Sequence, residues 1–244
     1  MAKKTQKKRK ALIVWGGWEG HEPRQVGEIL EGQLLEHGFK VDVSDTLDAY
    51  LDTRKLKRLD LIVPIWTMGT ITREQLAGLM AAVESGVGLA GCHGGMCDSF
   101  RQSCEYQFMT GAQWVAHPGN DAVRYRVKIT NKTHFITRGM RNFTVTSEQY
   151  YIHVDPANKV LATTRFPTVD GPHAANGPID VPVTYTRMWG KGRVFYTSLG
   201  HVAKTVAQAE ILRMLTRGLL WAAHAEDAAK PEPRKKKASA KKRK

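Results

Sequence analysis

Cysteine and long apolar runs are scarce in this sequence. Only 3 of its 244 residues are cysteine, an odd number that argues against a disulfide scaffold and favours a reduced, cytoplasmic compartment. No stretch approaches the roughly 18 apolar residues that a membrane span requires, and the lysine-rich N-terminus lacks the apolar segment of a secretory signal. We therefore expect a cytoplasmic protein without a membrane partner.

Excess charge is absent from the central part of the sequence. The net charge is +14, from 37 Lys and Arg against 23 Asp and Glu. Residues 1–10 and 230–244 hold 15 of these basic residues and 1 of the acidic ones, so residues 11–229 are neutral. Such runs bury too little apolar surface to offset chain entropy. We expect a disordered basic arm over 1–10 and a disordered basic tail over 226–244, which either bind a polyanion weakly or only aid solubility.

The first ninety-odd residues alternate between strand and helix patterns. Strands are predicted over residues 11–15 (ALIVW), 40–44 (KVDVS), 59–66 (LDLIVPIW) and 86–92 (GVGLAGC). Helical spacing of apolar residues follows Pro23 and follows a capping box of Thr72 and Gln75. This alternation implies right-handed crossovers and a parallel sheet that helices cover on both faces.

The later part of the sequence predicts antiparallel additions to that sheet. Strands are predicted over residues 122–130, 159–164, 182–188 and 193–198, the last two forming a hairpin across residues 190–192. Residues 166–182 predict a long loop beside a site, and residues 202–223 a closing helix. We therefore predict one α/β domain over residues 11–225. Its architecture is a flavodoxin-like three-layer sandwich with a mainly parallel sheet and added antiparallel strands.

Glycine, histidine and tryptophan gather just after the predicted strands, where parallel sheets bind ligands. The segments are residues 15–21 (WGGWEGH), 66–69 (WTMG), 91–95 (GCHGG) and 198–201 (SLGH). In 91–95 small neighbours flank His93, a pattern typical of a sharp strand-to-helix turn with a projecting central side chain. Class I glutamine amidotransferases have a cysteine there, whereas Cys92 comes one residue early and no His-x-Glu pair follows the last strand. Thiol-dependent amidotransferase chemistry is therefore not expected.

Five segments together resemble the ThuA-like family, the trehalose-utilisation proteins. They are residues 11–21 (ALIVWGGWEGH), 88–95 (GLAGCHGG), 111–119 (GAQWVAHPG), 146–156 (TSEQYYIHVDP) and 190–201 (GKGRVFYTSLGH). The resemblance implies an amidotransferase-like fold and a role in carbohydrate metabolism, on a sugar or keto-sugar derivative. The basic tails lie outside the resemblance.

The candidate catalytic residues are His93, Glu148 and His201. His93 would act as the central acid/base or metal ligand, and the placement of Glu148 depends on the family-like TSEQYY segment. The candidate substrate-binding residues are Trp18, His21, Trp66, Gly94, His117, Tyr150 and His153. Aromatic faces stack on sugar rings, and histidine and glutamate suit proton transfer near neutral pH.

The same polar residues equally suit a divalent metal such as zinc, and no tight pair of histidines decides between the two chemistries. The leading hypothesis is a cytoplasmic enzyme that acts on a small sugar. The alternative is a non-catalytic sugar-binding or regulatory protein on the same fold. The sequence leaves the oligomeric state open.

Overall fold

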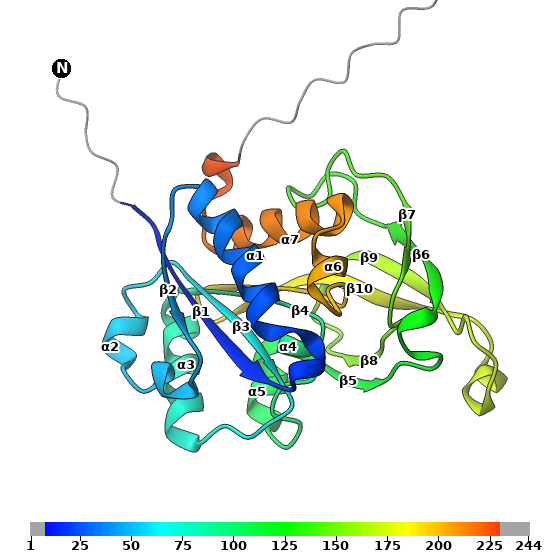
Figure 1. The fold of residues 1–244 in the computed structure, drawn as a ribbon, viewed down its shortest axis with the longest axis horizontal. Helices are drawn as coiled ribbons and strands as arrows, with labels where there is room; N and C mark the ends of the chain where they lie inside the picture. Colours follow the sequence, from blue (N-terminus) through cyan, green and yellow to red (C-terminus); the bar gives the residue numbers. More distant parts are fainter. Residues whose placement is uncertain (1–7, 230–244) are drawn as a thin grey trace, which may run out of the picture.

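The structure is a computed structural model that describes residues 8–229. A nine-stranded sheet runs through it in the order β2-β1-β3-β4-β11-β10-β9-β6-β7 (Figure 1). The parallel half contains β1 (Lys10–Gly17), β2 (Lys40–Ser44), β3 (Leu61–Thr67), β4 (Gly88–Cys92) and β11 (Gly192–Thr197). The antiparallel half adds β10 (Ile179–Trp189), β9 (Lys159–Phe166), β6 (Arg124–Ile129) and β7 (Phe143–Thr146).

Helices cover both faces of this sheet, as the strand–helix alternation predicts. Figure 1 shows α1 (Pro23–Glu36) and α7 (Ala209–Ala222) on one side, and α3 (Arg73–Ser85) and α5 (Cys104–Thr110) on the other. The remaining short helices are α2 (Thr53–Leu56), α4 (Gly94–Cys97) and α6 (Ala203–Val206), with 3-10 turns at Glu19–His21, Leu47–Tyr50, Asn120–Ala122, Pro172–Asn176 and Glu226–Ala228. The predicted three-layer α/β fold is confirmed.

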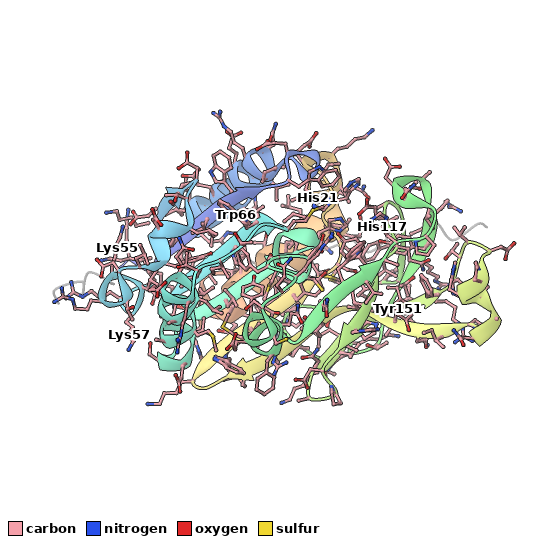
Figure 2. All side chains as sticks on the ribbon, turned by 90° about the horizontal axis from the view of Figure 1, so that it is seen from below. His21, Lys55, Lys57, Trp66, His117 and Tyr151 are labelled. Atoms are coloured by element: carbon pink, nitrogen blue, oxygen red, sulfur yellow. The ribbon has the colours of Figure 1, made fainter. Side chains whose placement is uncertain are left out.

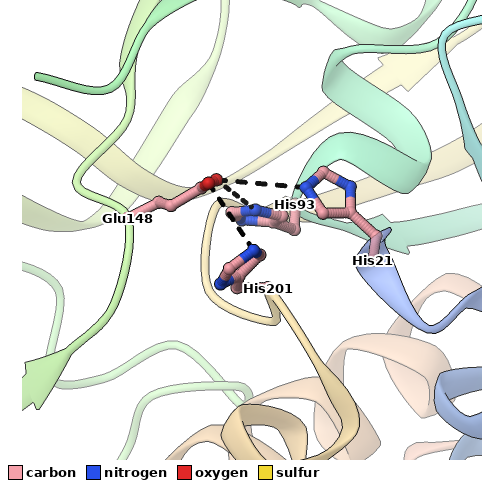
Figure 3. Close-up of side chains that lie close together, drawn as sticks. All are labelled: His21, His93, Glu148 and His201. Atoms are coloured by element: carbon pink, nitrogen blue, oxygen red, sulfur yellow. Dashed lines mark hydrogen bonds and ion pairs between the residues drawn. The ribbon is translucent and has the colours of Figure 1, made fainter. Parts of the chain in front are cut away.

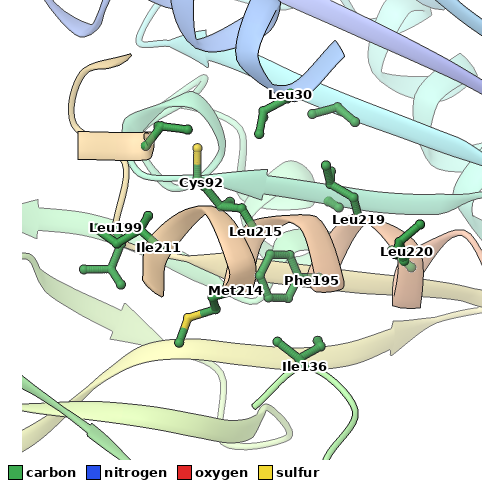
Figure 4. Close-up of a cluster of buried hydrophobic side chains, with 14 of the residues drawn as sticks. Leu30, Cys92, Ile136, Phe195, Leu199, Ile211, Met214, Leu215, Leu219 and Leu220 are labelled. Carbon is green, nitrogen blue, oxygen red and sulfur yellow. The ribbon is translucent and has the colours of Figure 1, made fainter. Parts of the chain in front are cut away.

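Each layer of helices has its own apolar core. In one, Leu30 of α1 and Leu215 and Leu219 of α7 pack with Phe195 of β11 (Figure 4). The other core joins β-strand side chains to α3, α4 and α5. Because successive strand residues point to opposite faces, a strand buried on both faces is apolar throughout. This explains why residues 11–15 and 61–65 contain almost no polar side chain.

Local signals place the helices where the sequence predicts them. Pro23 occupies the first turn of α1. The Thr72 hydroxyl accepts a hydrogen bond from the Gln75 amide at 3.2 Å, and the Gln75 side chain accepts one from the Thr72 amide at 2.9 Å. These two bonds satisfy amides that a helix start otherwise leaves unpaired, so the predicted capping box is confirmed.

Two local predictions need correction, and the strands β5 (Ala112–Ala116), β7 and β8 (Tyr151–Val154) were not predicted. The closing helix is interrupted between α6 and α7, because Gln208 takes an extended backbone conformation there. The strands β9 and β10 reach Phe166 and Ile179, so the predicted loop shortens to residues 167–178. The strands β5 and β8 form a separate antiparallel pair, and with five and four residues they carry little periodic signal.

The predicted arm over 1–10 and tail over 226–244 fall mainly outside the described residues. Their described ends belong to the fold, because Lys10 begins β1 and Arg9 forms an ion pair with Asp227 at 2.7 Å. Weak polyanion binding by the tails stays a prediction. Among residues 8–229, no helix is long and apolar enough to cross a membrane.

Candidate functional site

Residues from five separate connections meet beyond the carboxyl ends of the parallel strands. His21 follows β1, His93 follows β4 and His201 follows β11. Glu148 lies in the connection between β7 and β8, and His117 follows β5. His21, His93 and His201 point toward the Glu148 carboxylate (Figure 3). The structure therefore brings the three predicted catalytic residues together in one cluster.

Glu148 is the centre of this cluster. Its Oε2 lies 2.9 Å from His93 Nε2 and 4.0 Å from His21 Nε2. Its Oε1 lies 3.5 Å from His201 Nε2 and 3.7 Å from His117 Nδ1. One carboxylate thus faces four imidazoles, and its residue is only 5% exposed.

Hydrogen bonds on both sides of Glu148 fix the segment that presents it. The Tyr125 hydroxyl donates to the Glu148 carbonyl at 3.0 Å, and the Ser147 amide donates to the Val123 carbonyl at 3.0 Å. The buried Gln149 side-chain amide donates to the Thr164 hydroxyl at 2.8 Å. Because these partners come from β6 and β9 and the turn before β6, the antiparallel half of the sheet positions the carboxylate.

The turn after β4 holds His93 in an unusual backbone conformation. Its φ is 50° and its ψ is −140°, a region that non-glycine residues seldom adopt. Its amide donates to the Thr197 carbonyl at 2.8 Å, and its Nδ1 lies 2.8 Å from the Ser198 carbonyl. A carbonyl oxygen only accepts hydrogen bonds, so Nδ1 carries a proton and Nε2 is the atom directed at Glu148.

His93 lies deeper than its glycine-flanked turn predicts. The turn predicts an exposed side chain, but His93 is 1% exposed and is absent from the lining of the adjacent cavity. The Tyr150 ring stacks on it with centroids 4.1 Å apart, and Glu148 covers its Nε2. Glu148 is therefore the group of this pair that faces the cavity.

Burial and charge set the protonation of the cluster. Burial alone raises the pKa of Glu148, but the hydrogen bond from His93 and the nearby imidazoles outweigh it and lower this pKa to about 2. Burial, together with the neighbouring His93, lowers the pKa of His21 to about 3. Burial also lowers the pKa of His201. At neutral pH the site therefore combines an ionised carboxylate with uncharged His21 and His201 rings.

A cavity of about 460 Å³ opens beside the cluster. Trp18 stands at its rim, 47% exposed, and its ring centre lies 4.7 Å from that of His21 in an edge-to-face arrangement. Trp114 Nε1 and His117 Nδ1 are buried and have no hydrogen-bond partner among the described residues. The cavity is lined by Trp18, Gly20, His21, Met68, Asp98, Arg101, Trp114, His117, Asn120, Asp121, Glu148, Tyr150 and His201. Unpartnered polar atoms beside an exposed indole suit a ligand that carries both hydroxyl groups and apolar faces.

Trp114 and Arg101 were not predicted as residues of the site. Asp98 binds Arg101 through two hydrogen bonds of 2.6 and 2.9 Å, and the guanidinium carbon lies 4.6 Å from the Trp114 ring centre. Trp114 belongs to the family-like segment 111–119, which was its one signal in the sequence. Arg101 had none, because its role follows from neighbours in the folded chain.

Three predicted binding residues have other surroundings. Trp66 packs its ring against Gly16 and Gly69 and does not line the cavity. His153 is exposed on β8 and also lies outside the cavity lining. Gly94 lies under the His21 ring, where an added Cβ would come within 2.6 Å of a ring carbon. Gly94 therefore makes room for His21 rather than lining the cavity itself.

The predicted loop next to a site contributes nothing to the cavity lining, since none of residues 167–178 belongs to it. In Figure 2, Lys55 and Lys57 lie at the left, whereas His21 and His117 lie right of the centre of the molecule. A separate cavity of about 410 Å³ with several basic residues, Lys55 among them, is therefore remote from the histidine cluster.

The two buried cysteines lack the properties of a nucleophile. Cys92 and Cys97 are buried, and burial raises the pKa of each thiol to about 12. A thiol with so high a pKa carries almost no thiolate at neutral pH, and the thiolate is the reactive form. That Cys92 takes no part in the chemistry stays a prediction, which these properties favour.

We expect Cys92→Ala to keep its activity within about twofold while losing roughly 1–2 kcal/mol of stability, because a buried side chain is shortened. Thermal unfolding and steady-state kinetics of the purified variant measure the two effects. A variant with an unchanged melting temperature and no activity would contradict the assignment of Cys92 to the core.

Comparison with known proteins agrees with this architecture. The family profile described as "Trehalose utilisation", ThuA, matches residues 10–222. No curated protein sequence matches the chain significantly. A ThuA-like protein from Parabacteroides merdae superposes with a TM-score of 0.69 at 19% identity, over 89% of this chain and 90% of that one.

Two further solved structures share the fold. A ThuA-like protein from Bacteroides uniformis has a TM-score of 0.69 at 18% identity, covering 89% of this chain and 93% of that chain. A GMP synthase subunit from Thermoplasma acidophilum has a TM-score of 0.52 at 16% identity, covering 91% of this chain and 97% of that chain. At such identities the likeness concerns the fold, which is amidotransferase-like.

Proposed function

From the premise that this chain belongs to the ThuA family of trehalose-utilisation proteins, we propose that it is a cytoplasmic enzyme of carbohydrate metabolism. Its substrate is a small sugar or keto-sugar derivative, bound beside the histidine cluster. One observation carries this proposal: the Glu148 carboxylate stands between four imidazoles and faces a cavity with aromatic walls.

The proposed chemistry is proton transfer by Glu148. The carboxylate accepts a proton from a sugar hydroxyl or from the carbon beside a keto group, and returns it to another atom of the substrate. His93 Nε2, 2.9 Å from Oε2, stabilises the carboxylate and shares its proton. His201 Nε2, 3.5 Å from Oε1, is the second group that can give or take a proton at the cavity. Groups arranged in this way typically contribute about 10²- to 10⁴-fold to a rate.

Recognition of the sugar is assigned to the aromatic wall. The exposed Trp18 ring offers a face for the C–H side of a pyranose, and the Tyr150 ring, stacked on His93, lines the same cavity. The unpartnered Trp114 Nε1 can donate to a sugar hydroxyl, and His117 Nδ1 can donate or accept according to its tautomer. The family description, which names trehalose, supports a sugar over other ligands of similar polarity.

A non-catalytic sugar-binding or regulatory protein is the second candidate. The features that favour it are the aromatic rim and the unpartnered donors, which serve binding whether or not a reaction follows. The two candidates differ in whether the proton-transfer groups are used.

A substrate panel with a binding readout separates these functions. We expect trehalose, glucose or one of their keto derivatives to raise the melting temperature and to be converted to a product detectable by NMR. Trp18→Ala should weaken the binding of that sugar by about tenfold or more, since losing an aromatic contact costs roughly 1–2 kcal/mol. Trp189→Ala is a matched control, because Trp189 pairs with Gly192 at the start of β11, whereas the cavity lies beyond the end of that strand.

Stabilisation without any product would favour the binding protein. Neither stabilisation nor product, for any sugar in the panel, would contradict both candidates. Equal effects of Trp18→Ala and Trp189→Ala on sugar binding would show that the sugar does not bind in the proposed cavity.

A further inference from the structure

Four side chains of the cluster place their donor atoms close enough together to bind one metal ion. One ligand atom each from His21, His93, Glu148 and His201 lies within 4.8 Å of every other. The His21, His93 and Glu148 residues are buried, and His201 is mostly so. They come from three strand ends and one loop, so no local sequence pattern brings them together. This convergence is the first observation that points to an ion.

The distances between donors agree with coordination. A tetrahedral site with bonds of about 2.0–2.1 Å spaces its donor atoms about 3.3 Å apart. Glu148 Oε2 lies 2.9 Å from His93 Nε2 and 4.0 Å from His21 Nε2, and Glu148 Oε1 lies 3.5 Å from His201 Nε2. The four donor atoms, which lie within 4.8 Å of one another, would have to draw closer together when the ion binds.

The second observation is that the ring nitrogens directed away from the cluster, Nδ1 of His93 and of His21, have hydrogen-bond partners of their own. His93 Nδ1 donates to the Ser198 carbonyl at 2.8 Å, and His21 Nδ1 lies 2.8 Å from the Thr67 hydroxyl. Metal-binding histidines characteristically hydrogen-bond through the nitrogen that does not bind the ion, which fixes the ring and its tautomer. In both residues the remaining Nε2 is the atom that faces the cluster.

From these observations we propose that His21, His93, Glu148 and His201 bind one divalent transition-metal ion such as zinc. Three imidazoles with one carboxylate suit zinc, iron or cobalt better than magnesium or calcium, which prefer oxygen ligands throughout. Binding displaces the proton between His93 Nε2 and Glu148 Oε2 to solvent. This inference rests on the proposed function, since it concerns the same site. With the ion bound, His201 Nε2 is a ligand and no longer transfers protons, and the Glu148 oxygen that does not bind the ion is the one left to accept the substrate proton. The ion would supply a Lewis acid that polarises a sugar oxygen in the cavity.

The test uses the full chain, stripped with a chelator and then titrated with Zn²⁺ or Co²⁺. We expect one equivalent of metal per chain after desalting, and visible absorption bands for the Co²⁺ form. His201→Ala and Glu148→Gln should each weaken Zn²⁺ binding by about 100-fold or more, since loss of an outer partner alone costs about 10- to 100-fold. His153→Ala is the control, because His153 is exposed and lies outside the cluster.

A gentler variant keeps the test valid where a ligand substitution unfolds the protein. Thr67→Val preserves the side-chain shape but removes the hydroxyl beside His21 Nδ1, and we expect it to weaken Zn²⁺ binding by about tenfold. Less than stoichiometric binding, or equal binding by His201→Ala, Glu148→Gln and wild type, would overturn the inference. Turnover at an unchanged rate in the stripped protein would contradict the Lewis-acid role of the ion and leave the proposed enzyme standing. Stoichiometric metal binding without turnover of any sugar would contradict the proposed enzyme and leave the metal site standing.

Discussion

Glu148→Gln is expected to lower kcat/KM for the sugar substrate by about 10²- to 10⁴-fold, or roughly 3–5 kcal/mol of transition-state stabilisation. The substitution keeps the size and shape of the side chain, so the stacked Tyr150 and His93 rings need not move. It removes the negative charge that the surrounding imidazoles face, and a glutamine cannot accept a proton at neutral pH. Steady-state kinetics, with circular dichroism to check the fold, measure the loss.

The matched control is Glu19→Gln. Glu19 is exposed in the connection that carries His21, yet it does not line the cavity. The same chemical change at this position should leave kcat/KM within about twofold, as surface substitutions usually do. An active Glu148→Gln protein, or equal losses from the two substitutions, would show that the carboxylate at the centre of the cluster is not used in the reaction.

Much of the site follows from where strands end. His21, His93 and His201 are predictable as neighbours because each follows a strand of the parallel half, and the carboxyl ends of such strands share one edge. Glu148 is different, since it follows an antiparallel strand and its segment carries no periodic signal. Only the family-like TSEQYY pattern indicated it, and buried hydrogen bonds to β6 and β9 place it.

The sequence could not predict how deeply a side chain is buried, or which residues from other parts of the chain cover it. A glycine-flanked turn predicts that His93 projects, but whether it reaches solvent depends on Tyr150, whose ring arrives from a distant part of the chain. Trp66 illustrates the same limit, because its ring is covered by backbone at Gly16 and Gly69 instead of facing the cavity. Alternation along a strand gives the face of a side chain, and packing from other elements decides what covers it.

The two glycines that end β1 have a structural role that their short pattern did not reveal. A phosphate-binding loop was not predicted there, since the longer glycine motif is absent. Gly17 has φ of +80°, and an added Cβ would lie only 2.1 Å from the Thr67 carbonyl oxygen. That carbonyl also accepts a hydrogen bond from the Trp18 amide at 3.2 Å. The chain can therefore turn from β1 across β3 only if residue 17 has no side chain.

Gly17→Ala should consequently destabilise the protein by about 3 kcal/mol or more, from a left-handed backbone cost of about 1–2 kcal/mol and an overpacking cost of similar size. Gly32→Ala is its opposite, because Gly32 lies within α1 with open space around it, and alanine should stabilise that helix by about 0.5–1 kcal/mol. Urea unfolding of both variants measures the difference. Relief of the clash must move Trp18 or Thr67, so Gly17→Ala should also weaken sugar binding, whereas Gly32→Ala should not. Equal stabilities for the two variants would contradict the close approach of β1 to β3.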